Sequence, residues 1–186
     1  MISINALQNR SIAIFGTGKD AVKCAYNLCA QGISIESFFN NNKKINTFMG
    51  YSVHEPTTKY MTRGIYIVIA VGRISTYLEL AGQLNELGLV EFDDYIYYKW
   101  LDKKLVLLHG NCHMHIIKSY LESSNKFAEK YEFYPNPLIC NNKEGKIADK
   151  VFDYCDLWIH EDIQEDNEYG YFLSDVYIRG KWLGGG

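Results

Sequence analysis

The chain has 186 residues, of which 47% are hydrophobic and 22% are charged, and its formal net charge is −3. This balance supplies a core for one large domain or two small ones, and it argues against a nucleic-acid partner, which favours clustered basic residues. No basic start followed by a long apolar run opens the sequence, and residues 65–71, the longest apolar stretch, fall far short of the roughly 20 residues of a membrane span. The 5 cysteines have no paired spacing, which favours reduced thiols and a cytoplasmic protein.

Residues 11–100 alternate between short apolar runs and amphipathic segments, the pattern of strands and helices in an α/β sheet. We expect strands at residues 11–15, 33–39, 50–53, 64–70 and 94–100. We expect helices at residues 20–31 and 75–87, each followed by a glycine. The first helix is predicted to bury Cys24 and Cys29, and the second to bury Leu78 and Leu84. The alternation predicts a Rossmann-like, mainly parallel sheet with right-handed crossovers.

A second strand–helix cycle begins at residue 104. We expect strands at residues 105–108 and 156–159, an extended segment over 131–140, and helices at 113–123 and 147–154. A boundary near residue 101 divides the chain into a first domain, residues 1–101, and a second, residues 102–186. Three strands make only a small open sheet. We therefore expect either that another chain completes this α/β unit or, as the favoured interpretation, that the chain is a fragment of a longer protein.

The Gly16-Thr17-Gly18 turn joins the first predicted strand to the first helix. In this context one glycine permits a tight turn, the other lets a phosphate approach the backbone, and free N–H groups at the helix start attract an anion. The acid expected after the second strand is replaced by Asn40 or Asn41, and an amide bonds a ribose more weakly than a carboxylate does. Two interpretations stay open: the glycines only shape the turn, or Gly16, Gly18 and Asn40 bind a nucleotide or nucleotide-sugar.

A second special turn, Gly110-Asn111-Cys112-His113, follows the predicted strand at residues 105–108. A thiol at a helix N-terminus lies at the positive end of the helix dipole, which favours the thiolate. The Asn111 amide and the free N–H groups of the first turn would hold an oxyanion or a phosphate. The alternative is a structural cysteine buried in a tight turn.

Histidines surround this second turn. His109, His113 and His115 are candidate acids or bases because imidazole titrates near neutral pH. His160 ends a later predicted strand and is expected on the same rim, because ligands of open α/β sheets bind outside the carboxyl ends of the strands. The alternatives are surface histidines in a solvated loop and, least favoured, a metal site, for which no paired Cys or His spacing is present.

Three stretches of the first half share their residues with a known domain. They are Ile14-Phe15-Gly16-Thr17-Gly18, Ile35-Glu36-Ser37-Phe38-Phe39-Asn40-Asn41-Asn42-Lys43-Lys44, and Gly50-Tyr51-Ser52-Val53 with Pro56. Over about residues 10–100 the chain resembles the Rossmann-like domain attached to bacterial sugar-modifying enzymes, including the N-terminal domain of sugar acetyltransferases. The resemblance implies a nucleotide-sugar site or an accessory role, and Asn40 stands where that domain usually has Asp.

The second half carries a sharper set of matching residues. They are Leu107-Leu108-His109-Gly110-Asn111-Cys112-His113, Asp156-Leu157-Trp158-Ile159-His160 and Asp166-Asn167-Glu168-Tyr169-Gly170. These residues resemble the first part of the WcbI-type polysaccharide biosynthesis family, acetyltransferases of capsular sugars associated with coenzyme A. In place of the family's Gly-Asn-Cys-Gln, this chain has His113 at the last position.

The second resemblance implies a function and its residues. It implies that coenzyme A or acetyl-coenzyme A binds near Gly110, Asn111 and His160, that Cys112 and His113 are catalytic, and that the partner is a sugar or polysaccharide precursor. The alternatives are a non-catalytic nucleotide-sugar binding module and a thiol-dependent hydrolase. Self-association into a homo-oligomer is left open.

Overall fold

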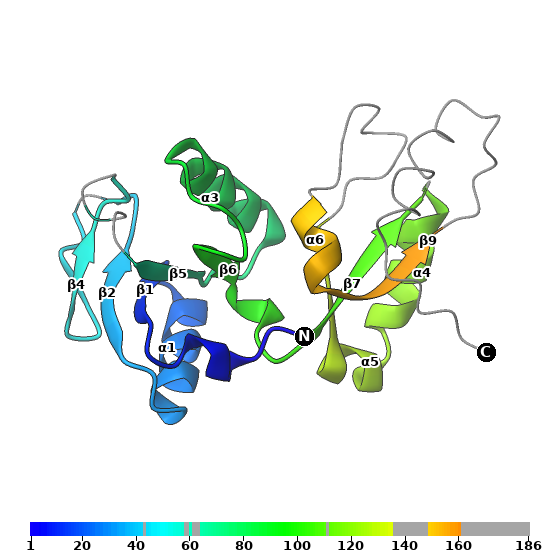
Figure 1. Cartoon of the computed structure of the whole chain (residues 1–186), viewed down its shortest axis with the longest axis horizontal. Coiled ribbons are helices and arrows are strands. Elements are labelled where there is room, and N and C mark those ends of the chain that lie inside the picture. Colours follow the sequence, from blue (N-terminus) through cyan, green and yellow to red (C-terminus); the bar gives the residue numbers. More distant parts are fainter. Residues whose placement is uncertain (43, 58–59, 61–63, 111, 136–148, 161–186) are drawn as a thin grey trace. The chain divides into compact units, whose positions relative to one another are not determined.

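The computed structural model describes residues 1–42, 44–57, 60, 64–110, 112–135 and 149–160 (Figure 1). The chain divides into two compact units: a first unit, Ser3–Leu101, and a second unit, in which Met1–Ile2 joins Asp102–Gly186. Each unit contains a sheet with helices between its strands, which confirms the predicted α/β class. Of the helices described, none has both the length and the apolar character needed to span a bilayer.

The first unit is built on a six-stranded sheet of order β3-β4-β2-β1-β5-β6. Its strands are β1 (Ser11–Phe15), β2 (Ile35–Phe39), β3 (Thr47–Phe48), β4 (Tyr51–His54), β5 (Ile65–Ile69) and β6 (Tyr95–Tyr97). All neighbours pair in parallel except β3 and β4, an antiparallel hairpin that turns at Met49 and Gly50, both with positive φ. The short 3-10 helix η1 (Ile4–Leu7) precedes β1. Helices α1 (Lys19–Ala30) and α3 (Ile74–Glu86) cover opposite faces of the sheet (Figure 1), as right-handed crossovers to either side of β1 require.

The central strands explain why this sheet could be predicted. Residues 12–15 of β1 and 66–69 of β5 are all buried, because helices on both faces leave no solvent-facing side to a central parallel strand. Their sequences are accordingly unbroken apolar runs. The predicted ends of both strands agree with the structure to within one residue.

The buried face of α1 is narrower than predicted. Ala21, Cys24, Ala25 and Leu28 are buried at spacings of three and four residues, and Cys24 agrees with the prediction. Cys29 is exposed, so its predicted burial is wrong. It follows Leu28 by one residue and therefore lies about 100° further round the helix.

Helix α3 shows the same kind of departure. It buries Tyr77, Leu80, Ala81 and Leu84, whereas Leu78, which was predicted to be buried, is 50% exposed. A spacing of three residues drifts round a helix of 3.6 residues per turn, so an evenly spaced apolar series does not stay on one face.

Aromatic side chains close the end of the first unit. The sequence predicts a strand up to residue 100, but β6 ends at Tyr97 and the 3-10 helix η2 (Tyr98–Trp100) follows. This turn places the fully buried Trp100 against Tyr77 and Phe92, with ring centroids 5.2 and 5.6 Å apart. Burying a large apolar side chain stabilises the fold by about 1.5–3 kcal/mol, so this corner holds the last residues of the unit firmly to the sheet.

The second unit contains a parallel three-stranded sheet of order β8-β7-β9. Its strands are β7 (Lys104–His109), β8 (Tyr131–Phe133) and β9 (Cys155–His160), and its helices are α4 (His113–Glu122), α5 (Asn125–Lys130) and α6 (Asp149–Tyr154). The sequence did not predict α5. The predicted extended segment beyond residue 135 and the first two residues of the predicted helix 147–154 lie outside the described residues.

The core of the second unit lies between the sheet and helices α4 and α5. Val106 and Leu108 of β7 and Phe133 of β8 pack with Met114 of α4, and Phe127 of α5 lies at the margin. Successive residues of a strand point to opposite faces, so the alternate residues of β7 and β9 face the other side, towards α6.

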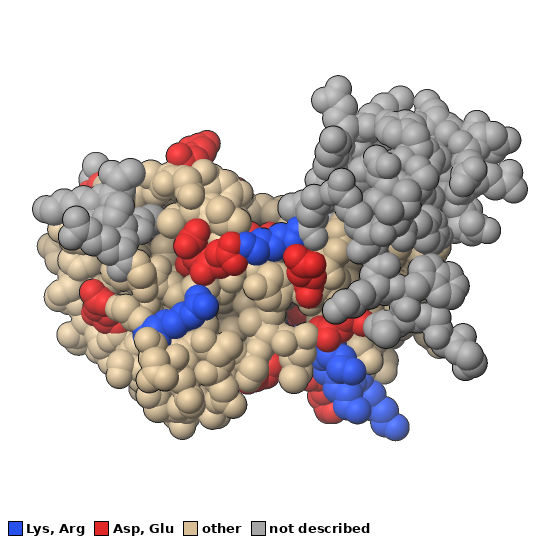
Figure 2. All heavy atoms as spheres, viewed as in Figure 1, with Lys and Arg blue, Asp and Glu red and all other residues tan. Residues whose placement is uncertain are grey.

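Figure 2 shows the charged side chains on one face of the molecule. On the face drawn in Figure 2, the described Lys and Arg side chains are few and lie beside Asp and Glu side chains, so they form no continuous basic stripe there.

Candidate functional site

The Gly16-Thr17-Gly18 turn lies at the carboxyl end of β1, as predicted, and Gly18 caps the start of α1. Gly16 has φ +134°, and a Cβ at this position would stand 2.6 Å from the carbonyl oxygen of Ala70. Its N–H donates a hydrogen bond to the carbonyl oxygen of Phe39 at 3.0 Å. Gly16 is therefore required for the close approach of β1, β2 and the end of β5, whether or not a ligand binds.

A carboxylate occupies the crevice between the carboxyl ends of β1 and β5, where the strand order reverses and ligands of such sheets usually bind. Asp20, in the first turn of α1, accepts a hydrogen bond from the hydroxyl of Tyr98 at 2.8 Å. Its other oxygen would lie 2.8 Å from a Cβ on Gly72, in the loop after β5. Burial, and then the bond to Asp20, raise the pKa of Tyr98, so this hydroxyl stays protonated and donates.

This carboxylate bears directly on the predicted phosphate. Asp20 places a negative charge at the positive start of α1. Two cations lie close by, because Lys19 is the first residue of α1 and the Nζ of Lys99 donates to the carbonyl oxygen of Gly72 at 3.1 Å. Nucleotide binding at this turn stays a prediction.

Asn40 lies at the end of β2 and links two turns. Its Nδ2 donates to the hydroxyl of Thr17, and its Oδ1 accepts from the backbone N–H of Asn42 at 2.6 Å. The three predicted nucleotide-binding residues of the first unit are thus brought together, but both ends of the Asn40 amide are used within the chain.

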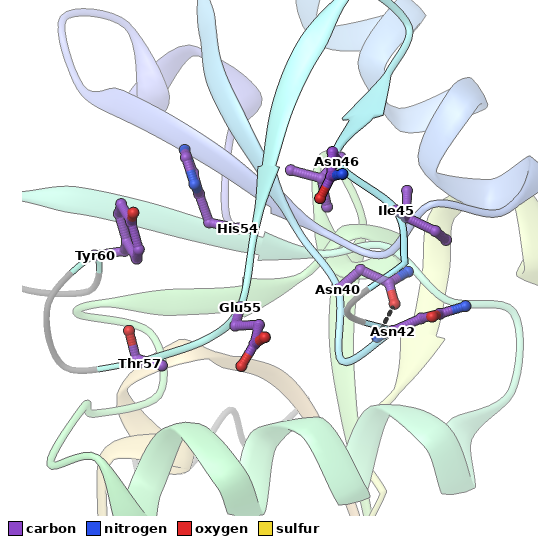
Figure 3. A pocket seen from close by; sticks show the side chains of 9 residues that line it. Asn40, Asn42, Ile45, Asn46, His54, Glu55, Thr57 and Tyr60 are labelled. Carbon is purple, nitrogen blue, oxygen red and sulfur yellow. Dashed lines mark hydrogen bonds between the residues drawn. The ribbon is translucent and has the colours of Figure 1, made fainter.

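A pocket of about 300 Å³ opens beside Asn40, beyond the carboxyl ends of β2 and β4. Figure 3 shows that its lining comes from the segment between β2 and β3 and from the end of β4 onwards. The lining residues are Asn40, Asn42, Ile45, Asn46, Val53, His54, Glu55, Thr57 and Tyr60. Sequence reasoning found Asn40 alone, because the others stand on the segment between β2 and β3, at the end of β4 and in the segment after it, which share no motif. The run of three asparagines was the available signal.

The second candidate site stands at the carboxyl end of β7. Gly110 is buried, Cys112 is exposed at the cap of α4, and His113 is the first residue of that helix and exposed. The helix begins where the sequence predicts, and the alternative of a buried structural cysteine is wrong for Cys112. Asn111 lies outside the described residues.

Two histidines meet at the same end of the sheet. His109 of β7 and His160 of β9 are direct neighbours in the parallel register, and the ring of Trp158 lies 4.8 Å from that of His160. His109 is 3% exposed, and burial, together with the neighbouring His160, lowers its pKa to about 4. His109 is therefore neutral at pH 7, whereas His113 stands in solvent beside Cys112.

The buried His109 predicts a pH dependence of stability. Between its folded pKa of about 4 and the ordinary value of 6.5, the unfolded chain takes up a proton that the folded chain does not. The free energy of unfolding should therefore fall as the pH is lowered from 6.5 towards 4, by up to roughly 3 kcal/mol from this residue. His109→Gln, which cannot be protonated, should flatten this slope in urea titrations across that pH range.

A control for this prediction is available on α4. His115 is exposed, so His115→Gln should leave the slope as it is in the unsubstituted protein. Equal slopes for the unsubstituted protein and His109→Gln would contradict the prediction.

Neither a protein-family model nor a curated protein sequence matches the chain. The fold and the two turns define an α/β protein with two open, mainly parallel sheets, each carrying a polar rim at the carboxyl ends of its strands. Within the ranges that the structure describes, no group of three or more His, Cys, Asp or Glu side chains is arranged to hold a metal ion.

Proposed function

We propose that the protein is an acetyltransferase of capsular or cell-surface polysaccharide biosynthesis, which moves an acetyl group from acetyl-coenzyme A to a sugar hydroxyl. The observation that supports it most is the exposed thiol of Cys112 at the start of α4, with His113 beside it and His160 at the end of the neighbouring strand. Open α/β sheets bind ligands at this end. The resemblance of this turn to the WcbI-type motif favours acetyl transfer over other thiol chemistry.

The described residues suit the predicted cofactor. Helix α4 has 10 residues, and the first N–H groups of such a helix have no partners within it, so those near Cys112 and His113 would hold phosphate oxygens of coenzyme A. Gly110 has no side chain, so none covers the backbone just before this turn, where the cofactor would bind. When bound, acetyl-coenzyme A supplies the acetyl group as a thioester.

The chain's own residues would then carry the transfer. The sulfur of Cys112 forms a bond to the acyl carbon while the thioester C–S bond breaks, and the thiol proton goes to the departing sulfur. The sugar hydroxyl next attacks the acyl group on Cys112, and His113 moves the hydroxyl proton back to the Cys112 sulfur. The sum is one acetylated sugar and one free thiol of coenzyme A.

The test is acetyl transfer to a panel of hexoses, N-acetylhexosamines and their UDP derivatives, with acetylated sugar measured by mass spectrometry. Cys112→Ala should lower the rate by at least about 100-fold, and His113→Gln by about 100-fold, because each removes a reacting group. His115→Gln is the matched control, since His115 is exposed on the same helix. It should stay within about twofold of the unsubstituted protein.

Three outcomes would contradict the proposal. Acetate released without any acetylated sugar would indicate a thiol-dependent hydrolase. Nucleotide-sugar binding without thioester turnover would indicate a non-catalytic binding module. An active Cys112→Ala variant would remove this cysteine from the reaction.

A further inference from the structure

The geometry points to the outward faces of α1 and α3 as the two halves of a head-to-tail contact, in which α1 of one molecule packs antiparallel on α3 of a second copy of the chain. The two helices cover opposite faces of one sheet, so each molecule carries both halves (Figure 1). This inference concerns the first unit and does not depend on acetyl transfer in the second.

An exposed stripe of residues runs along the outward side of each helix. The spacing within each stripe is four, three and four residues, which keeps its members within about 60° of one another round the helix and opposite the buried residues. The stripe of α1 is Lys19, Lys23, Tyr26 and Ala30, and the stripe of α3 is Ser75, Glu79, Gly82 and Glu86, all of them exposed. Each helix therefore presents a row with the spacing of a coiled-coil seam.

The two stripes carry opposite charges. The α1 stripe has two lysines and no carboxylate, whereas the α3 stripe has two glutamates and no lysine or arginine. None of these charged side chains makes an ion pair or a hydrogen bond with any residue that the structure describes. The stripes of one molecule cannot meet, because the sheet lies between them. A second copy of the chain supplies the matching charge to each stripe.

The ends of the two helices favour the antiparallel direction. Glu86 is the last residue of α3, at the negative end of the helix dipole, and that last turn has no basic residue. Lys19 is the first residue of α1, where the adjacent Asp20 is already bonded to Tyr98. In an antiparallel pair the start of α1 lies beside the end of α3, so Lys19 of one copy would bring Glu86 of the other the cation that its own helix end lacks.

The antiparallel register pairs the charges better than the parallel one. Layer by layer, Lys19 faces Glu86, Lys23 faces Gly82, Tyr26 faces Glu79 and Ala30 faces Ser75 of the second copy. In this register the ammonium of Lys23 can reach both glutamates. The parallel register would leave Lys19 opposite Ser75 and Glu86 opposite Ala30, so only one opposite-charge pair would form.

Gly82 gives the α3 stripe an open gap in its middle. Within the described part of the chain, no atom lies within 4 Å of a Cβ built at this glycine. A neighbouring helix can therefore approach closely there, and the ring of Tyr26, which is 67% exposed, would lose exposed apolar surface against the gap. Shape as well as charge thus fits α1 to α3.

The contact is expected to be weak and sensitive to salt. A single pair of helices of 12 and 13 residues buries less than the roughly 1,200–2,000 Å² of a stable interface, and exposed ion pairs each contribute little. We expect a dissociation constant of about 10–100 µM at about 50 mM sodium chloride. It should rise about tenfold at about 0.5 M, because salt screens the lysines and glutamates.

The experiment is sedimentation velocity of the full chain between about 5 and 500 µM. The average mass should rise with concentration beyond that of a dimer, because every added copy leaves one stripe of each kind available. A monomer throughout would overturn the inference. A dimer as the largest species would indicate a two-fold contact and would overturn it as well.

Reversing the charges tests the register. Lys19→Glu and Glu86→Lys should each weaken association by at least about tenfold, because each places like charges face to face. The double variant should return to within about threefold of the unsubstituted protein, since the same pair is then formed with its charges exchanged. Lys126→Glu is the matched control, an equal charge change at an exposed position of α5, and should associate as the unsubstituted protein does. Absence of rescue in the double variant would contradict the antiparallel pairing.

A mixing experiment tests the head-to-tail arrangement. Lys23→Glu blocks the α1 stripe and Gly82→Arg blocks the α3 stripe, and circular dichroism should show unchanged helix content because both positions are exposed. Each variant alone should associate at least about tenfold more weakly than the unsubstituted protein. An equal mixture should form dimers and nothing larger, since each variant keeps one intact stripe. A mixture that stays monomeric, or one that grows beyond dimers, would overturn the inference.

Discussion

Replacing Gly16 with alanine is expected to lower the free energy of unfolding of the first unit by about 3–4 kcal/mol. Two penalties combine at this position. The added Cβ would stand 2.6 Å from the carbonyl oxygen of Ala70, which belongs to backbone and cannot turn away as a side chain could. The residue also holds φ +134°, which favours glycine. Urea unfolding followed by circular dichroism measures the loss.

Gly18 provides the matched control. It lies two residues away in the same turn, has φ −98°, and has no atom within 4 Å of an added Cβ. Gly18→Ala should therefore cost less than about 1 kcal/mol, the difference between glycine and alanine as a helix cap. If the two variants lost similar amounts of unfolding free energy, the close contact between Gly16 and Ala70 would not be what makes Gly16→Ala costly.

Cys112 is expected to react with iodoacetamide at neutral pH at least about 100-fold faster than Cys24. Cys24 is 4% exposed, and burial raises its pKa to about 12, so it reacts only when the helix opens locally. Cys112 is exposed at the positive end of α4, which stabilises negative charge on a nearby sulfur. Timed labelling and peptide mass spectrometry measure both rates in one sample.

Cys29 serves as a control that separates the effect of exposure on the labelling rate from the effect of position along a helix. It is exposed like Cys112 but lies in the last turn of α1, at the negative end of that helix. Cys112 should react faster than Cys29, and coenzyme A should slow only Cys112. Equal rates at the two exposed thiols, or no protection by coenzyme A, would leave Cys112 as an ordinary surface thiol.

The sequence predicts the sheets well where burial is complete on both faces. The runs in β1 and β5 contain no polar interruption, so their limits follow from composition alone. It predicts helix faces less well, because Cys29 and Leu78 are apolar residues just outside the buried stripe. The short elements β3 and α5 span too few residues to show a period.

The candidate sites, like the fold, could be predicted from the sequence only in part. The turns at Gly16 and Cys112 can be located because each follows a strongly apolar strand and precedes a helix. The Asp20 carboxylate beside Gly72 could not be foreseen, since it depends on how the ends of two strands meet. The pocket near Asn46 and His54 is likewise assembled by pairing of strands, and no local motif marks it.

The lengths of the two edge strands determine whether the first unit can associate with other proteins by strand pairing. One border of its sheet is β3, with two residues, and the other is β6, with three residues before the chain turns into η2. Each border offers too few unpaired backbone groups to extend the sheet with a strand from another molecule. Assembly of this unit with a copy of itself would therefore have to use helix or loop surfaces. Its short edge strands disfavour fibre-like stacking through strand pairing.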